Sequence, residues 1–154
     1  MNKQNGFTVL EVVVVVLILS IVAGVGISKF YYTQPVIHTA KIKSDISLIR
    51  LALSDAKTAS VLKNEFFQIK SLDNAQINIP NENLFTGFDD IKLLSYPIIS
   101  STSKDAVGGN WVKMSNDTYR AYVSKNDFID FKYNSLDNSF ECDYAIDLCK
   151  ELRQ

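Results

Sequence analysis

The chain has 154 residues, of which 16 are basic and 17 acidic, and 47% are hydrophobic. This length predicts one compact domain with an appended element. The formal net charge is −1 with both signs intermixed, which argues against the basic stripe of a nucleic-acid-binding surface and the acidic tail of a disordered chain. The hydrophobic residues are unevenly spread, because the Val, Ile and Leu excess lies near the N-terminus.

The N-terminal segment predicts a transmembrane helix over residues 7–28. Its side chains are apolar or small, apart from Glu11 and three hydroxyl residues, and about 20 such residues span a bilayer as a helix. A secretory signal peptide has a shorter apolar stretch followed by a small-residue cleavage site, which is absent here. A plain single-pass anchor remains an alternative, but it leaves the Glu11 carboxylate unexplained.

A short polar leader, residues 1–6, precedes the apolar segment and ends in Gly6. The sequence Gly6-Phe7-Thr8-Val9-Leu10-Glu11, followed by an unbroken apolar run, resembles the class III signal of type IV pilins and type II secretion pseudopilins. The resemblance implies that a prepilin peptidase cuts between Gly6 and Phe7 on the cytoplasmic side. It also implies N-methylation of Phe7 and retention of the apolar segment.

Glu11 is then the fifth residue of the processed chain, where this family carries a glutamate. Family members are thought to pair this glutamate with the terminal amine of a neighbouring subunit. An unpaired carboxylate in a low-dielectric helix bundle is costly, whereas a paired one is tolerated. We therefore expect Glu11 to set the register of assembly, with residues 7–28 in the filament core.

One position departs from the family pattern. Many pilins carry a proline where this chain has Ser28, and the next proline here is Pro35. Gly24 and Gly26 are candidates for softening the helix instead. Lys29, Tyr31 and Tyr32 stand where interfacial residues are expected.

Residues 29–61 predict an amphipathic continuation of the helix, with a kink or brief break at Pro35. An apolar stripe at spacings of three or four is formed by Ile42, Ile46, Ile49, Leu53 and Ala56. The charged residues on other faces are Lys41, Lys43, Asp45 and Arg50. The family resemblance implies that the stripe packs against the sheet of a globular head, residues 62–154.

The head predicts a small antiparallel sheet. Residues 63–103 have a weak pattern, with one short helix or strand near Ile91–Tyr96, and a strand is expected at Trp111–Met114. Three runs rich in aromatic and β-branched residues, 118–123, 128–133 and 139–144, predict an antiparallel meander. A long N-terminal helix packed on such a sheet is an α+β fold.

The two cysteines, Cys142 and Cys149, lie close together near the C-terminus. In an oxidising compartment this spacing predicts one small disulfide-closed loop, with Cys142 ending the last strand. In a cytosolic protein they would be two unpaired thiols.

The sequence contains no phosphate-binding loop, zinc-ligand spacing or nucleophile elbow, so we expect no enzyme activity and no cofactor. His38, the only histidine, has no ligand or catalytic partner near it in sequence. Five acids lie close together in the C-terminal third: Asp127, Asp130, Asp137, Asp143 and Asp147. Calcium is the cation that they could bind, but acidic residues in solvent-exposed turns are the favoured interpretation. The head's basic residues are scattered, which argues against a nucleic-acid partner.

The resemblance implies a structural subunit of a type IV pilus-like filament or of a type II secretion pseudopilus. Its expected partners are other copies, related subunits, prepilin peptidase, membrane lipid, and an inner-membrane assembly platform with its ATPase. Its expected location is the bacterial inner membrane, single-pass, with the head in the periplasm or otherwise outside the cytoplasmic membrane, and then the filament. The alternatives are a non-polymerising anchored binding protein and a minor pilin of a competence system that captures DNA.

Overall fold

The structure is a computed structural model that describes residues 8–64 and 68–153, without the side chains of residues 25–35. The long helix α1 spans Val9–Leu62 and stays helical at Pro35, so the brief break expected there is absent. The expectations for the side chains of Gly26, Ser28, Lys29, Tyr31 and Tyr32 fall outside this description. The chain divides into two compact units, Met1–Gln34 and Pro35–Gln154.

Among the helical residues described, no stretch combines the length and the apolar character needed to cross a membrane. The transmembrane helix expected over residues 7–28 is therefore not found in the described part of the chain.

In its described residues, the second unit contains eight short strands and a C-terminal helix, α2 (Asp147–Arg153). The main sheet is an antiparallel meander in the order β5-β6-β7-β8. Its strands are β5 (Asn110–Lys113), β6 (Thr118–Tyr122), β7 (Phe128–Asn134) and β8 (Ser139–Cys142). Two antiparallel ribbons pair β1 (Asn83–Leu84) with β4 (Ile98–Ile99), and β2 (Gly87–Phe88) with β3 (Ile91–Lys92). The α+β class expected from the sequence is confirmed.

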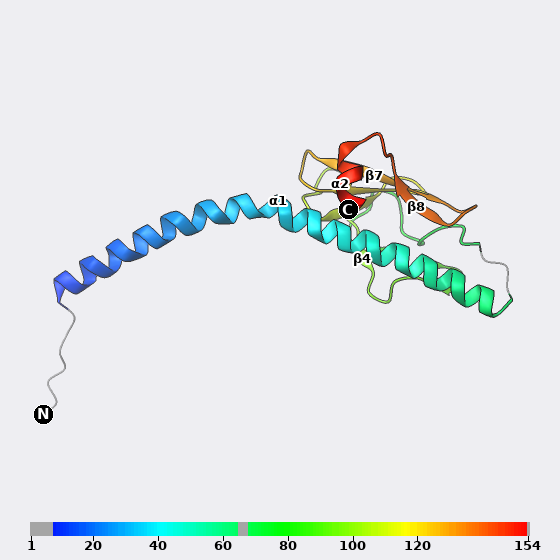
Figure 1. The fold of residues 1–154 in the computed structure, drawn as a ribbon, viewed down its shortest axis with the longest axis horizontal. Coiled ribbons are helices and arrows are strands. Elements are labelled where there is room, and N and C mark those ends of the chain that lie inside the picture. Colours follow the sequence, from blue (N-terminus) through cyan, green and yellow to red (C-terminus); the bar gives the residue numbers. More distant parts are fainter. Residues whose placement is uncertain (1–7, 65–67, 154) are drawn as a thin grey trace, which may run out of the picture. The chain divides into compact units, whose positions relative to one another are not determined.

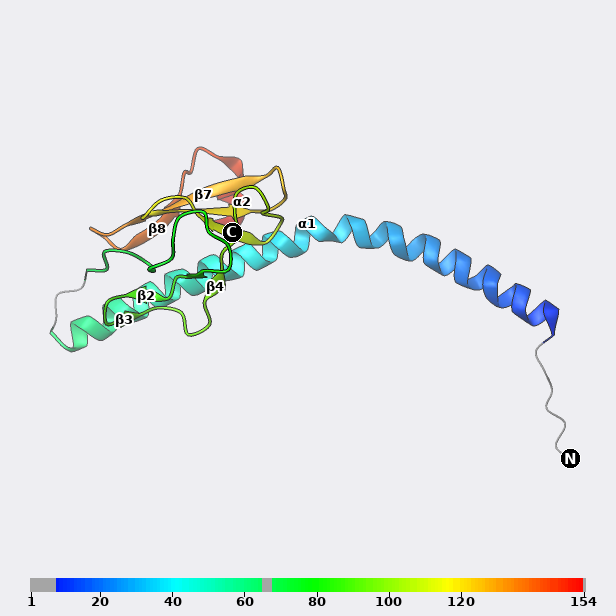
Figure 2. The same cartoon turned by 180° about the vertical axis from the view of Figure 1, so that it is seen from behind.

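The second half of α1 packs against this sheet. Figures 1 and 2 show β7, β8 and α2 along the cyan-to-green part of α1 from both sides. The apolar stripe of the helix is buried, with exposed fractions of 0–4% for Ile42, Ile46, Ile49 and Leu53. It meets a cluster of aromatic side chains from the sheet and from the segment before it: Phe85, Trp111, Tyr119, Phe131 and Phe140. The predicted amphipathic stripe is thus the helix side of the head's core.

The alternation expected in β7 is also present. Ile129, Phe131 and Tyr133 are buried, whereas Phe128, Asp130 and Lys132 point away from the core. In β6, Tyr119 and Ala121 are fully buried on the same face of the sheet. The opposite face is partly covered by a second, smaller cluster that includes Ala106, Val112 and Tyr122.

Asp45 is an exception to the predicted polar face of α1. Its side chain is only 13% exposed, and its Oδ2 accepts hydrogen bonds from Trp111 Nε1 at 2.9 Å and from Lys41 Nζ at 2.8 Å. Lys41 also donates to the carbonyl oxygen of Gly109 at 2.8 Å. The carboxylate is tolerated in the core because a cation and an indole N–H satisfy it. It connects α1 to the start of β5.

A buried ion pair links the segment after α1 to the sheet. Lys113 Nζ lies 2.7 Å from Asp73 Oδ1, and the two side chains are 4% and 0% exposed. Asp73 Oδ2 also accepts the backbone N–H of Phe85 at 2.9 Å. Phe85 is fully buried with φ of 59°, a conformation that costs a bulky residue about 1–3 kcal/mol. Asp73 therefore holds a strained residue at the centre of the aromatic cluster.

The C-terminus differs from the expected loop. Cys142 ends β8, as expected, and forms a disulfide with Cys149 across a Cα–Cα distance of 5.8 Å. However, Cys149 lies in α2, a helix that was not expected from the sequence. Cys149 and Leu152 are the buried residues of this helix, so burial of one short face and the covalent link hold it against the sheet. In the segment expected near Ile91–Tyr96, only Ile91–Lys92 is regular, as β3.

The Asp73→Asn variant should destabilise the head strongly, because it leaves the buried Lys113 ammonium without a counter-ion. We expect a loss of about 3–5 kcal/mol in the free energy of unfolding. Urea unfolding of the full chain in detergent, followed by the fluorescence of the single buried tryptophan, Trp111, measures it. The matched control is Asp147→Asn, which removes an exposed ion pair with Lys150 and should cost about 1 kcal/mol or less. Equal effects of the two changes would contradict the structural role of Asp73.

Replacing both cysteines, Cys142→Ser with Cys149→Ser, should lower the free energy of unfolding by about 2–3 kcal/mol in the chain-entropy model. The same urea titration measures it. A reductant should destabilise the original chain by a similar amount and leave the double variant unchanged. A reductant effect on the double variant would show that the change does not arise from this disulfide.

Candidate functional site

The N-terminal motif is the first candidate site. Gly6 and Phe7, the expected cleavage and methylation residues, lie outside the described residues. The description begins at Thr8, directly before α1, whose first turn contains Glu11. Thr8 donates its backbone N–H and its hydroxyl to Glu11 Oε2, both at 2.8 Å, and the Thr8 hydroxyl accepts the N–H of Glu11 at 3.3 Å.

This reciprocal arrangement is a capping box, in which a threonine before the helix and a glutamate three residues later satisfy each other's backbone groups. The first helical bond follows directly, from the N–H of Val12 to the carbonyl oxygen of Thr8 at 3.2 Å. Both Thr8 contacts use Glu11 Oε2, and within the described residues no hydrogen bond to Oε1 is present. The exposed Glu11 side chain therefore keeps one oxygen available for a cation.

The sequence-based expectations gave Thr8 no functional role. The spacing Thr-x-x-Glu directly before an apolar run is the sequence signature of a capping box, so the signal was present at Thr8 and Glu11. From the sequence, Glu11 was expected to act only in contacts between subunits. The structure adds an intrachain role for the same carboxylate.

The N-terminal part of α1 presents apolar side chains in all directions. Between Val9 and Val22 the large apolar side chains are 48–83% exposed. A soluble monomer rarely exposes a continuous apolar surface of this extent, and such surfaces mark contacts with protein or lipid. The first turn of α1 thus combines a polar capping group with an uncovered apolar helix.

A second cluster of charges surrounds the disulfide. Glu141, next to Cys142, accepts one hydrogen bond at Oε2 from Arg50 Nη2 of α1 at 2.8 Å, and the same oxygen lies 3.0 Å from Arg153 Nη1 of α2. Arg50 also donates to the carbonyl oxygen of Phe140. Partial burial lowers the pKa of the Arg50 guanidinium, and the charge of Glu141 acts in the opposite direction. The cluster therefore connects α1, β8 and α2 through charged hydrogen bonds.

The acids considered for calcium are each engaged locally. Asp130 forms a bidentate pair with Arg120, and Asp147 pairs with Lys150. Asp127, Asp137 and Asp143 accept hydrogen bonds within their own turns, from Ser124, Ser139 and Ala145. The Ser139 hydroxyl and N–H lower the pKa of Asp137. Within the described residues, no group of three or more His, Cys, Asp or Glu side chains is placed to hold a metal ion.

His38 packs against a turn of the sheet. A Cβ added to Gly108 would clash with His38 Cδ2 and with the carbonyl oxygen of Val123. The next residue, Gly109, has φ of 84°, which favours glycine. The imidazole therefore fills the space that the two glycines leave between α1 and the start of β5.

The N-terminal segment matches a known protein family. Residues 1–27 match the model of a family described as the prokaryotic N-terminal methylation motif. No curated protein and no solved structure matches the chain. The matched segment contains the leader, Gly6, Phe7, Thr8 and Glu11. The chain therefore carries, at residues 1–27, the N-terminal methylation motif that is the class III signal of type IV pilins and pseudopilins.

Proposed function

We propose that this chain is a structural subunit of a type IV pilus-like filament or type II secretion pseudopilus, assembled through its N-terminal helix. The motif indicates a type IV pilin-like protein or pseudopilin processed by prepilin peptidase. The observation that carries the proposal further is the start of α1. There, a capped glutamate with one available oxygen precedes an apolar surface with nothing covering it in the described chain.

The charge of Glu11 and the exposed apolar surface of α1 fit one kind of assembly. Cleavage between Gly6 and Phe7 creates a positive amine, and Glu11 supplies the opposite charge. In a bundle of apolar helices, the dielectric is low and a carboxylate without a partner is costly, so the helices dock where Glu11 of one subunit meets the amine of another. Neighbouring helices then cover the apolar side chains between Val9 and Val22, which lipid covers before assembly.

Within this class we favour a pseudopilin or minor pilin of a type II secretion or competence-type system. The head supports this choice because it is compact, with a single short disulfide loop closed by Cys142 and Cys149. The subunit is held in the inner membrane before assembly, with its head outside the cytoplasmic membrane. An assembly platform and its ATPase supply the energy. The function is mechanical, with no enzyme activity and no cofactor.

The Gly6→Ala variant should accumulate as the unprocessed chain, because the peptidase must accommodate an added Cβ at the residue it cuts after. Intact mass and N-terminal sequencing of protein from membranes, with and without prepilin peptidase, measure the processing. The original chain should begin at N-methylated Phe7 only when the peptidase is present. An original chain that still begins at Met1 beside active peptidase would refute the proposal.

The Glu11→Gln variant should be processed normally but should form at least about tenfold less filament, because losing one charge-pair contact of about 1.4 kcal/mol changes an equilibrium tenfold. Glutamine can still complete the capping box, so the change removes the charge and retains the cap. Quantitative electron microscopy of filaments sheared from cells measures the yield.

The matched control is Thr8→Val, which removes the hydroxyl of the cap and keeps the Glu11 charge. Its helix start should lose about 0.5–2 kcal/mol, with a smaller loss of filament than in Glu11→Gln. A non-polymerising anchored protein would show no filament in any variant. A normal filament yield from Glu11→Gln would contradict the role of this charge in setting the register of assembly.

A further inference from the structure

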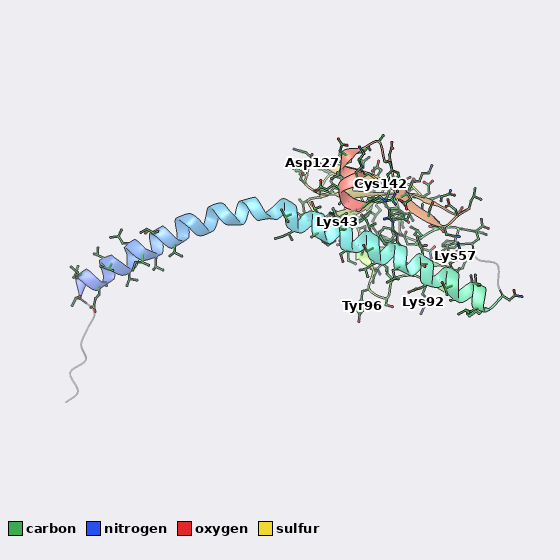
Figure 3. All side chains as sticks on the ribbon, in the orientation of Figure 1. Lys43, Lys57, Lys92, Tyr96, Asp127 and Cys142 are labelled. Carbon is green, nitrogen blue, oxygen red and sulfur yellow. A yellow bond between two sulfur atoms is a disulfide. The ribbon has the colours of Figure 1, made fainter. Side chains whose placement is uncertain are left out.

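The segment after α1 meets the sheet at a lysine and an aspartate that are both shielded from water. Lys113 is the only buried lysine among those whose side chains the structure describes, whereas Lys57 and Lys92, which Figure 3 labels, are exposed. The Lys113 and Asp73 side chains are 4% and 0% exposed. In each of the other ion pairs of the described residues, at least one side chain is 40% or more exposed. This pair therefore lacks the contact with solvent that stabilises separate charges elsewhere in the chain.

The nitrogen of Lys113 is held against Asp73. Among the described residues, every hydrogen bond of Lys113 Nζ goes to Asp73, to Oδ1 at 2.7 Å and to the carbonyl oxygen at 3.4 Å. The contact at Oδ1 keeps the nitrogen beside Cγ, the carbon to which that oxygen is bonded. Two reacting groups held in this way react as if at an effective concentration of up to about 10⁸ M. An amine and a carboxyl group kept in contact are the reactants of an amide bond.

We propose that Lys113 and Asp73 become joined by an amide bond between their side chains once the head has folded. The ion pair is the state before this reaction. A proton first passes from the ammonium to the carboxylate, because neutral groups need no solvation in the core. The Nζ lone pair then attacks Cγ and the bond from Cγ to Oδ1 breaks. Oδ1 leaves as water, with one proton from the acid and one from the amine, so no oxidant, reductant or other co-reactant is required.

Two backbone groups hold the carboxyl group of Asp73 for this step. The N–H of Phe85 donates to Oδ2 at 2.9 Å, and the N–H of Ala75 donates to Oδ1 at 3.1 Å. When the nitrogen attacks Cγ, negative charge develops on Oδ2. A fixed N–H group at this distance stabilises such a charge, as in an oxyanion hole. The carboxyl group is thus oriented and activated by the chain around it.

Tyr119 is the proton carrier of the reaction. Its side chain is fully buried, and its hydroxyl is the one buried side-chain polar atom of the described residues that has no hydrogen-bond partner. Lys113 Nζ lies 5.8 Å from the centre of its ring. Burial, followed by the nearby charge of Asp73, raises the pKa of the phenol, so the hydroxyl keeps its proton at physiological pH. It gives this proton to the leaving oxygen and takes one from the attacking nitrogen.

The amide closes a much longer loop than the disulfide does. Asp73 and Lys113 are 40 positions apart, whereas the two cysteines are separated by 7. A cross-link over a longer loop constrains the unfolded chain more strongly. The bond therefore fastens the segment after α1 to β5 in a subunit whose proposed function is mechanical.

The intact mass of the full chain, purified from membranes, tests the bond. Amide formation lowers the mass by one water beyond the two hydrogens lost with the disulfide. Tryptic digestion locates the link, because residues 71–92, with Asp73, stay joined to residues 105–120, which are no longer cut at Lys113. The matched control is Lys113→Arg, which retains the charge beside Asp73 but has a guanidinium that stays protonated and does not attack. The bond lies within one chain, so the test does not depend on processing or on filament formation.

We expect the original chain to lack one water and to give the joined peptides, and Lys113→Arg to have its full mass. Tyr119→Phe, which removes only the hydroxyl, should form the bond at least about a hundredfold more slowly in samples taken over time after synthesis. An unchanged rate would overturn the role of Tyr119. A full mass in the original chain would overturn the bond itself. A loss of water that persists in Lys113→Arg would also overturn it, because the aspartate would then have closed onto its own backbone as a succinimide.

Discussion

The head depends on the burial of one apolar stripe of α1 against the face of a four-stranded sheet. Ile42, Ile46 and Ile49 are almost completely buried, and the side chains that meet them are mostly aromatic. Neither partner is stable alone, because an isolated amphipathic helix is marginal in water and a small sheet needs a covered face. The polar contacts of the head fix the position of α1 on the sheet. Asp45 fixes α1 to Trp111, and Arg50 fixes it to the strand that carries Cys142.

The two parts of α1 differ in what covers their apolar side chains. From residue 42 onward its apolar residues form a stripe that the chain's own sheet covers. Between Val9 and Val22 they surround the helix, and the described chain offers no cover for them. A helix that is apolar on all sides is stable only where other helices or lipid surround it. The first part thus requires partners that the second part does not.

Periodic patterns predicted the parts of the fold in which burial alone selects the conformation. The α1 stripe and the alternation of Ile129, Phe131 and Tyr133 are of this kind, and so is the meander from β6 to β8. Of the two-residue strands, only β3 falls in a segment where a short helix or strand was expected, near Ile91–Tyr96. The others were missed because strands this short carry no period. The helix α2 was missed because it has seven residues and depends on the link through Cys149.

Polar groups in the core were the least predictable. From the sequence alone, Asp45 is expected at the surface, because its partner Trp111 lies 66 positions later in the chain. The same holds for Asp73, whose partner Lys113 lies 40 positions away. At the candidate site, Glu11 was identified because a charge in an apolar run is conspicuous. Its bond to Thr8 lies within one helical turn and could have been predicted from the spacing alone.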